Sequence, residues 1–168
     1  MIQECLNHVT GCLKSIGINS ILEDEDKINN FKGFKYAAIV VGDETLVKDG
    51  SLVAKIDKLG EMKRIYRRRI YTRDVPILVL IVDKNKELVD GHLQAFLTAI
   101  GSGIKDADEN YIFITASNPN WLEERSKLKQ RSGVEISLTF GGGIYKDTEK
   151  QLIDLFAAMQ IETELGGV

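Results

Sequence analysis

Residues 62–82 join a strongly basic segment to a strongly apolar one, which limits the folds open to this chain. Six lysines and arginines fall within the eleven residues from Lys63 to Arg73. The apolar run Val75–Val82 has eight residues and contains Pro76. A transmembrane helix needs about 20 consecutive apolar residues, so this run is too short to span a bilayer.

We expect two long strands here, Met62–Arg73 and Ile77–Val82, separated by Asp74–Pro76. Pro76 would open the second strand, where the absence of a backbone N–H is tolerated. Because side chains alternate faces along a strand, the cations of the first strand would lie on both faces. At least part of that strand must then leave the core, as a sheet edge or an extended basic β-hairpin.

Periodic apolar residues predict three helices and further strands around this segment. Apolar side chains at three- and four-residue steps predict an N-terminal amphipathic helix over residues 2–16. Asp83 or Asn85 would cap a central helix, and Thr148 with Gln151 forms a capping box for a C-terminal helix. The other expected strands are 36–44, 50–57, 111–117 and 133–140. This order predicts one α+β domain over residues 1–168, with the N-terminal, central and C-terminal helices packed on a mostly antiparallel sheet.

The same spacing predicts which helix residues face inward. Cys5 and Cys12 would lie about 10 Å apart along the first helix, whereas a disulfide needs Cα atoms within about 7 Å. We therefore expect two buried, small hydrophobic side chains rather than a disulfide. The residues expected to face inward on the central helix are Leu88, Leu93, Phe96, Leu97 and Ile100, and on the last helix Leu152, Leu155, Phe156 and Met159.

The net charge of −3 is unevenly distributed. Residues 62–86 hold 8 basic and 2 acidic side chains, whereas residues 1–61 hold 7 and 10 and residues 87–168 hold 7 and 13. A basic middle between acidic flanks suits charge-complementary contact between copies of the chain or with another protein. The N-terminus carries Glu4 and no basic stretch followed by an apolar one, so we expect no secretory signal and a cytosolic chain.

Stretches that resemble ligand-binding motifs each lack a required residue. A calcium-like loop has Leu88 where the sharp-turn glycine belongs, and "GGGIYKDT" has Tyr145 where a phosphate loop needs a glycine before its lysine. We expect Gly141–Gly143 to allow a bulge or a close backbone approach instead. No Cys-x-x-Cys pair occurs, and His8 and His92 are the only histidines. We therefore expect no enzyme, no cofactor and no metal site.

Three interpretations of the basic strand stay open from the residues alone. Charged residues on an edge strand prevent uncontrolled sheet pairing. Nucleic-acid binding would use the arginines against phosphates and the tyrosines against bases, although the pI of about 5.5 and the absence of a binding module oppose it. An interface uses the same side chains, because Arg and Tyr are enriched at binding hot spots. We favour the interface, with the candidate residues Arg64, Tyr66, Arg67, Arg68, Arg69, Tyr71 and Arg73.

The whole chain resembles the tail terminator (tail completion) proteins of long-tailed phages and phage-tail-like particles. The resemblance lies in the size and in the order of elements. An N-terminal helix ending near "SIGI" leads to "YAAIVVGDE" and then to "RIYRRRIYTRDVPILVLIVD". The helix "ELVDGHLQAFLTAI", the strand "YIFITA" and the strand "VEISLTFGGGIY" follow.

This resemblance implies a structural protein of a virion, a prophage-encoded particle or a phage-tail-like bacteriocin. Such a protein forms a homo-hexameric ring that caps the tail tube protein, stops its polymerisation and presents a surface to the head–tail connector. In a contractile particle it also holds the last ring of the tail sheath. It would assemble in the bacterial host cytoplasm and then become part of the tail, without membrane or specific nucleic-acid partners.

Overall fold

The chain divides into two units in the computed structural model, which describes residues 1–23, 25–31, 33–126 and 129–152. Unit 1 comprises Met1–Thr45 and Asp74–Gly142, and unit 2 comprises Leu46–Arg73 together with the chain from Gly143 onward. Each unit is described separately below. The sequence-based expectation of a single domain over residues 1–168 stays a prediction.

The N-terminal and central helices are confirmed in unit 1. They are α1 (Ile2–Ser15) and α3 (Lys86–Ile100), and a short helix that was not expected, α2 (Glu25–Asn30), lies between them in sequence. Both cysteines of α1 are buried and neither forms a disulfide. His8 Nε2 donates a hydrogen bond of 2.8 Å to the carbonyl oxygen of Ile100, so α1 and α3 are in direct contact.

The cap and the buried face of α3 agree only in part with expectation. Asn85 is the N-cap, and its side chain accepts a 2.9 Å hydrogen bond from the backbone N–H of Leu88. Leu88 and Leu97 are exposed, at 44% and 37%, so their assignment to the inner face is wrong. Val89 is fully buried instead. The buried side chains lie at three- and four-residue steps, which makes one narrow apolar face: Val89, Leu93, Phe96 and Ile100.

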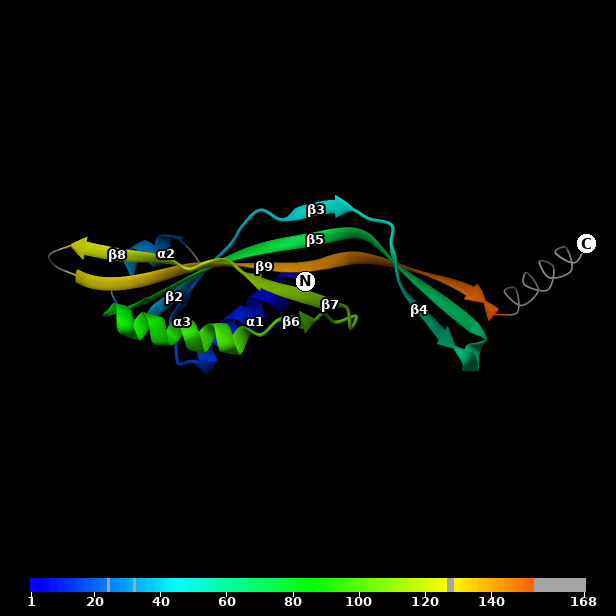
Figure 1. Ribbon diagram of the computed structural model, residues 1–168, viewed down its shortest axis with the longest axis horizontal. Coiled ribbons are helices and arrows are strands. Elements are labelled where there is room, and N and C mark those ends of the chain that lie inside the picture. The colour runs from blue at the N-terminus through cyan, green and yellow to red at the C-terminus, as the bar shows by residue number, and fades with distance from the viewer. Residues whose placement is uncertain (24, 32, 127–128, 153–168) are drawn as a thin grey trace, which may run out of the picture. The chain divides into compact units, whose positions relative to one another are not determined.

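One sheet contains all the strands (Figure 1). Its members are β1 (Ile21–Leu22), β2 (Tyr36–Val41), β3 (Thr45–Lys48), β4 (Leu52–Lys58), β5 (Lys63–Asp83), β6 (Gly103–Lys105), β7 (Tyr111–Ala116), β8 (Asn120–Ser126) and β9 (Lys129–Gln151). The order is β1-β2-β5-β9-β7-β6, with β3 and β4 pairing with β5 and β8 pairing with β9. β1 is parallel to β2, whereas β2–β5, β4–β5, β6–β7, β7–β9 and β8–β9 are antiparallel. The expectation of a mostly antiparallel sheet is confirmed.

The core of unit 1 lies between its part of this sheet and the helices α1 and α3. Cross-strand pairs such as Ile39 with Val79 and Ile114 with Phe140 point toward the helices, and their exposure is 8% or less. Alternation along β5 places Leu78 and Leu80 on the opposite face, where both are only partly buried. The apolar run of β5 is therefore fully buried on one face only.

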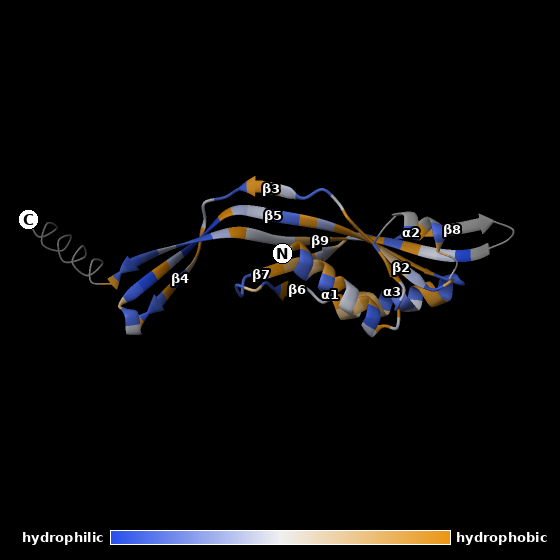
Figure 2. Cartoon of the chain, turned by 180° about the vertical axis from the view of Figure 1, so that it is seen from behind, coloured by the Kyte–Doolittle hydropathy of each residue, from blue (hydrophilic) through white to orange (hydrophobic). Residues whose placement is uncertain are grey.

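Unit 2 is a sheet that buries little. Among its described residues, 46–73 and 143–152, only Ile65 and Leu152 are buried. β4 pairs with the basic half of β5 through the 3₁₀ turn Leu59–Glu61, and Met62 closes that turn in the left-handed region, with φ of 51°. Figure 2 shows that β4 and its neighbouring strands carry many hydrophilic residues.

The expected break between two strands at Asp74–Pro76 is absent, because β5 runs without interruption through 21 residues. Pro76 fits within a strand since only its carbonyl is used there: it accepts a 2.9 Å hydrogen bond from the N–H of Gly42. A basic hairpin does exist, but its second strand is β4 and not the apolar half of β5. The strand predicted over residues 50–57 thus has its partner.

The start of the expected C-terminal helix is also wrong. Thr148 and Gln151 belong to β9, so they form no capping box. Leu152 is buried, as expected, and its N–H donates a 2.8 Å hydrogen bond to the carbonyl of Met62. Strand pairing therefore overrides the local helix signal. Leu155, Phe156 and Met159 lie outside the described residues.

Candidate interface on unit 2

The seven candidate residues lie on the basic half of β5, paired with β4. The register Ile56↔Ile65 and Asp57↔Arg64 places cross-strand neighbours on a common face. Alternation then separates Arg64, Tyr66 and Arg68 from Arg67 and Arg69. The cations lie on both faces of this small sheet, as the sequence predicts.

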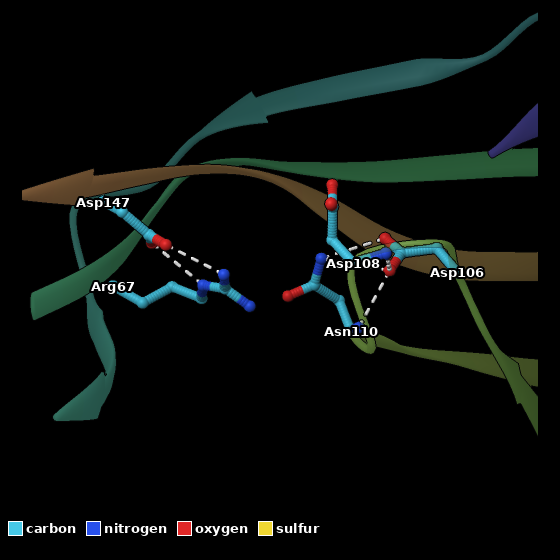
Figure 3. Close-up of polar contacts among 5 residues, drawn as sticks. All are labelled: Arg67, Asp106, Asp108, Asn110 and Asp147. Atoms are coloured by element: carbon cyan, nitrogen blue, oxygen red, sulfur yellow. Dashed lines mark hydrogen bonds and ion pairs between the residues drawn. The ribbon is translucent and has the colours of Figure 1, made fainter. Parts of the chain in front are cut away.

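Two of these arginines bind carboxylates through two nitrogens each. Arg64 donates from Nε and Nη2 to Asp57, with Nη2–Oδ2 at 2.9 Å. Arg67 donates from Nε to Asp147 Oδ1 at 2.9 Å and from Nη2 to Oδ2 at 2.8 Å (Figure 3). Such forked pairs fix the orientation of the guanidinium plane as well as its position. Arg64 is thereby held against β4, and Arg67 against β9.

The segment between β3 and β4 binds two further arginines. Asp49 Oδ1 accepts hydrogen bonds from the backbone N–H groups of Gly50 and Ser51, at 2.6 and 2.9 Å. Asp49 Oδ2 accepts from Arg69 Nε at 2.6 Å, and the carbonyl of Gly50 accepts from Arg68 Nη1 at 3.1 Å. A tight Asp-Gly-Ser turn therefore positions both arginines.

Lysines extend the network along β9. Lys63 Nζ lies 3.2 Å from Glu149 and 3.7 Å from Glu61. The ammonium group of Lys150 lies 5.8 Å from the centre of the Tyr66 ring, within cation–π range. Most of the basic run is thus matched to acidic or aromatic groups of the same unit.

The pKa shifts agree with these contacts. Hydrogen bonds from the N–H groups of Ser51 and Gly50, followed by that from Arg69, hold the pKa of Asp49 well below its usual range. Hydrogen bonding to Arg64 lowers the pKa of Asp57, and hydrogen bonding to Asp57 in turn raises the pKa of Arg64.

Contacts with β9 shift pKa values in the same sense. Hydrogen bonding to Arg67 lowers the pKa of Asp147. Hydrogen bonding to Glu149 raises the pKa of Lys63. These contacts favour the charged forms of Asp147 and Lys63.

Exposure distinguishes the candidates from one another. Arg68 and Tyr71 are exposed, whereas the other five are partly buried. Around them unit 2 exposes large apolar side chains, including Leu59 at 74% and Val47 at 56%. The solvent-exposed surface of unit 2 therefore consists of apolar side chains, Arg68 and Tyr71, over a framework of ion pairs.

Sequence reasoning missed the acidic partners, because Asp49, Asp57 and Asp147 lie in three separate segments. The Asp-Gly pair at 49–50 is a turn signal that could have located the first of them.

The expected close backbone approach within Gly141–Gly143 is confirmed at Gly143. A Cβ there would approach Arg69 Cδ to 2.7 Å and the carbonyl of Tyr71 to 3.0 Å. No larger residue fits there without a shift.

Two polar groups of unit 1 have contacts that the sequence did not predict; one of them, Asp83, was a candidate cap of α3, a role that Asn85 takes. Asp83 is 5% exposed, and its Oδ2 lies 3.1 Å from His92 Nε2. Asp106 accepts hydrogen bonds from the backbone N–H groups of Asp108 and Asn110, at 2.9 and 2.8 Å (Figure 3). Burial acts to raise the pKa of Asp106, but hydrogen bonds from Asn110 and Asp108 outweigh it and the pKa is lowered. Asp106 thus holds a turn, and Asp83 links the end of β5 to α3.

Within the described part of the chain, no three His, Cys, Asp or Glu side chains are grouped so as to hold a metal ion. No helix in the same residues is long and apolar enough to cross a membrane.

Comparisons with known proteins identify no family. No family model matches this chain, and no curated protein matches it. A chain of the virion of a native gene transfer agent (GTA) particle is a structural neighbour, with a TM-score of 0.37 and 9% identity. The match covers 82% of this chain and 93% of that one. This TM-score is too low to assign a shared fold.

Proposed function

We propose that this chain is a structural protein of a phage tail or tail-like particle, and more narrowly a tail terminator. Six copies form a ring on the last ring of tail-tube subunits, stop tube growth and make the head-proximal end. In a contractile particle the ring also holds the last sheath subunits. Unit 2 supplies contacts to neighbouring subunits or to the tube.

The exposed surface of unit 2 is the observation that carries this proposal. Its described residues bury two side chains and expose Leu46, Val47, Leu52, Val53, Ile56, Leu59, Met62, Tyr71 and Ile144. Exposed apolar groups of this number mark binding surfaces. Arg68 and Tyr71 are the residue types that dominate interface energetics. A sheet of this kind is suited to assembly with other subunits.

The charges of the two units support contact between different surfaces of neighbouring copies. Over the full sequence, unit 1 holds 11 basic and 17 acidic side chains, a net charge of −6, and unit 2 holds 11 and 8, a net charge of +3. Opposite charges steer association and fix its register. A contact between two different patches generates a ring when the rotation closes.

The order of elements supports the tail terminator in particular. α1, β2, β5, α3, β7 and β9 occupy, in this order, the segments that carry the sequence resemblance. The gene transfer agent chain adds no weight, because its TM-score is too low.

The ion pairs of unit 2 make nucleic-acid binding the weaker alternative. Affinity for duplex DNA comes from cations that release counterions from phosphates. Lys63, Arg64, Arg67 and Arg69 already bind carboxylates. Their use against phosphate would first require these pairs to break.

Two measurements test the proposal. Native mass spectrometry of the purified protein should give a mass six times that of the 18.8 kDa chain, alone or on tube protein. Deleting the gene in the phage or bacterium that encodes it should leave tail tubes of irregular length in electron micrographs. Tubes of normal length without this chain would overturn the proposal.

A further inference from the structure

An apolar groove lies on the face of the unit 1 sheet that points away from α1 and α3. Its lining residues are Tyr36, Leu80, Val82, Leu122, Arg131, Ser132 and Gly133. Cross-strand pairing of Val40 with Leu78, and of Tyr36 with Val82, extends the apolar strip along β2 and β5. Val40 and Leu122 are 49% and 40% exposed, so this strip meets solvent.

The size of the groove favours a side chain over a small molecule. Its volume is about 160 Å³, whereas pockets for small ligands are typically about 300–1,000 Å³. Gly133 forms part of its floor, where a Cβ would contact Leu80 Cδ1 and Val82 Cγ2 at 3.5 Å each. One apolar side chain of a docked segment fits this space.

Arg131 lines the groove and pairs across the β8–β9 ladder with Glu124, and Lys84 shares an aromatic neighbour with Arg131. The guanidinium carbon of Arg131 lies 5.6 Å from the centre of the Phe34 ring, and Lys84 Nζ lies 5.7 Å from it. Phe34 itself is 46% exposed. An apolar floor beside an aromatic ring and two cations fits an apolar segment that carries carboxylates.

The chain itself contains such a segment. Residues 153–168, outside the described residues, hold three acidic side chains and no lysine or arginine. Leu155, Phe156 and Met159 recur at the spacing of one helix face. Amphipathic segments of this kind bind apolar grooves through side chains at three- and four-residue steps.

We propose that this groove binds residues 153–168 of a neighbouring copy of the chain. The apolar side chains of the segment enter the strip around Leu80 and Leu122, and its carboxylates lie near Lys84 and Arg131. The inference rests on the proposed function in one respect, because the ring supplies the neighbouring copy. It adds a specific contact that links each subunit to the next.

Disulfide trapping between two variants that each carry one added cysteine tests the contact. Leu122→Cys and Ala157→Cys chains, carrying different affinity tags, are co-expressed and oxidised with copper phenanthroline. The native cysteines are 0% and 8% exposed and add little background. Matched controls replace Leu122→Cys by Leu97→Cys on α3 or by Val53→Cys on unit 2, at comparable exposure of 37% and 43%.

We expect the 122–157 disulfide to form at least about 10-fold faster than either control disulfide. Similar rates at all three positions, or a faster reaction at Val53, would overturn the inference. A protein that is monomeric by native mass spectrometry would overturn the proposed function as well. An oligomer without a fast 122–157 disulfide would overturn this inference alone.

A variant that fills the groove supplies a second readout. Gly133→Leu should slow the 122–157 disulfide at least about 5-fold while the melting temperature stays close to that of the parent. If Gly133→Leu does not fold, Leu122→Asp replaces it, because the side chain of residue 122 is exposed. Trapping is then measured between Val40→Cys and Ala157→Cys. Unchanged trapping in the folded variant would contradict docking in this groove.

Discussion

Arg67 binds both carboxylate oxygens of Asp147, a residue 80 positions away in the sequence. The contact joins β5 to β9 within unit 2, where the described residues bury only two side chains. Since little apolar burial stabilises this unit, we infer that its ion pairs determine the orientation of the strands more than they add to stability.

Replacing Arg67 by Lys should test whether its two-nitrogen contact with Asp147 orients the strands. Lys keeps the charge but cannot form the two parallel hydrogen bonds. Because both partners are partly exposed, we expect a coupling energy of about 1 kcal/mol or less with Asp147→Asn in a double-mutant cycle. Urea unfolding of the four proteins measures it. A coupling of several kcal/mol would mean that the pair stabilises the whole fold.

Acid should loosen the turn that Asp49 holds. The folded-state pKa of Asp49 is below the ordinary value of 3.8, so the stability it contributes is present above that value. It is lost as the pH falls below about 4 toward the lower folded pKa. The amide resonances of Gly50 and Ser51, followed by NMR between pH 6 and pH 2, should shift together only at the acid end. In Asp49→Asn these amides should show no such step, and a parent titration centred above 3.8 would contradict the assignment.

Two neighbouring residues of β5 should differ sharply in their cost to folding. Ile77 is fully buried, whereas Leu78 points to the other face and is only partly buried. Ile77→Ala should lower the free energy of unfolding by about 2–5 kcal/mol, and Leu78→Ala by clearly less. Chemical denaturation of both variants measures the difference. Equal losses would show that the face of Leu78 is covered by another surface.

The exposed candidates should matter for assembly and not for folding. The double variant Arg68→Ala, Tyr71→Ala removes the two exposed candidates and breaks no ion pair among the residues that the structure describes. We expect near-normal thermal melting and at least about 10-fold weaker ring formation or tube binding, because hot-spot truncation costs about 2 kcal/mol or more.

Lys14→Ala on the exposed surface of α1 serves as the control for this variant. It should change neither melting nor assembly. The same test on the triple variant Arg67, Arg68, Arg69→Ala is less direct, since that variant also removes partners of Asp147 and Asp49. Normal assembly of the double variant would contradict a role of Arg68 and Tyr71 in the interface.

Much of unit 1 could be predicted because its signals are local. The spacing of Cys5, Val9 and Leu13 predicts α1, and Asn85 predicts the start of α3. The prediction that Leu88, and not Val89, faces the core was wrong, since periodicity gives the direction of a helix face only to within about one residue position.

Unit 2 could be predicted less well because its contacts are distant in sequence. Nothing near Arg67 indicates Asp147, and a local capping pattern at Thr148 gave way to strand pairing. Pro76 suggested the start of a separate strand, yet one strand runs through it because only its carbonyl is needed. The placement of cations on both faces of β5 could be predicted from the alternation of a strand, but their carboxylate partners could not. The interface role of these residues stays a prediction.

The uninterrupted course of β5 and β9 affects how the molecule can be cut. The backbone passes from one unit to the other three times, at 45–46, 73–74 and 142–143. A single protease cut between Thr45 and Leu46 therefore leaves both units covalently joined through the other two passages. Neither unit can be expressed as one continuous fragment, so its properties have to be measured in the full chain.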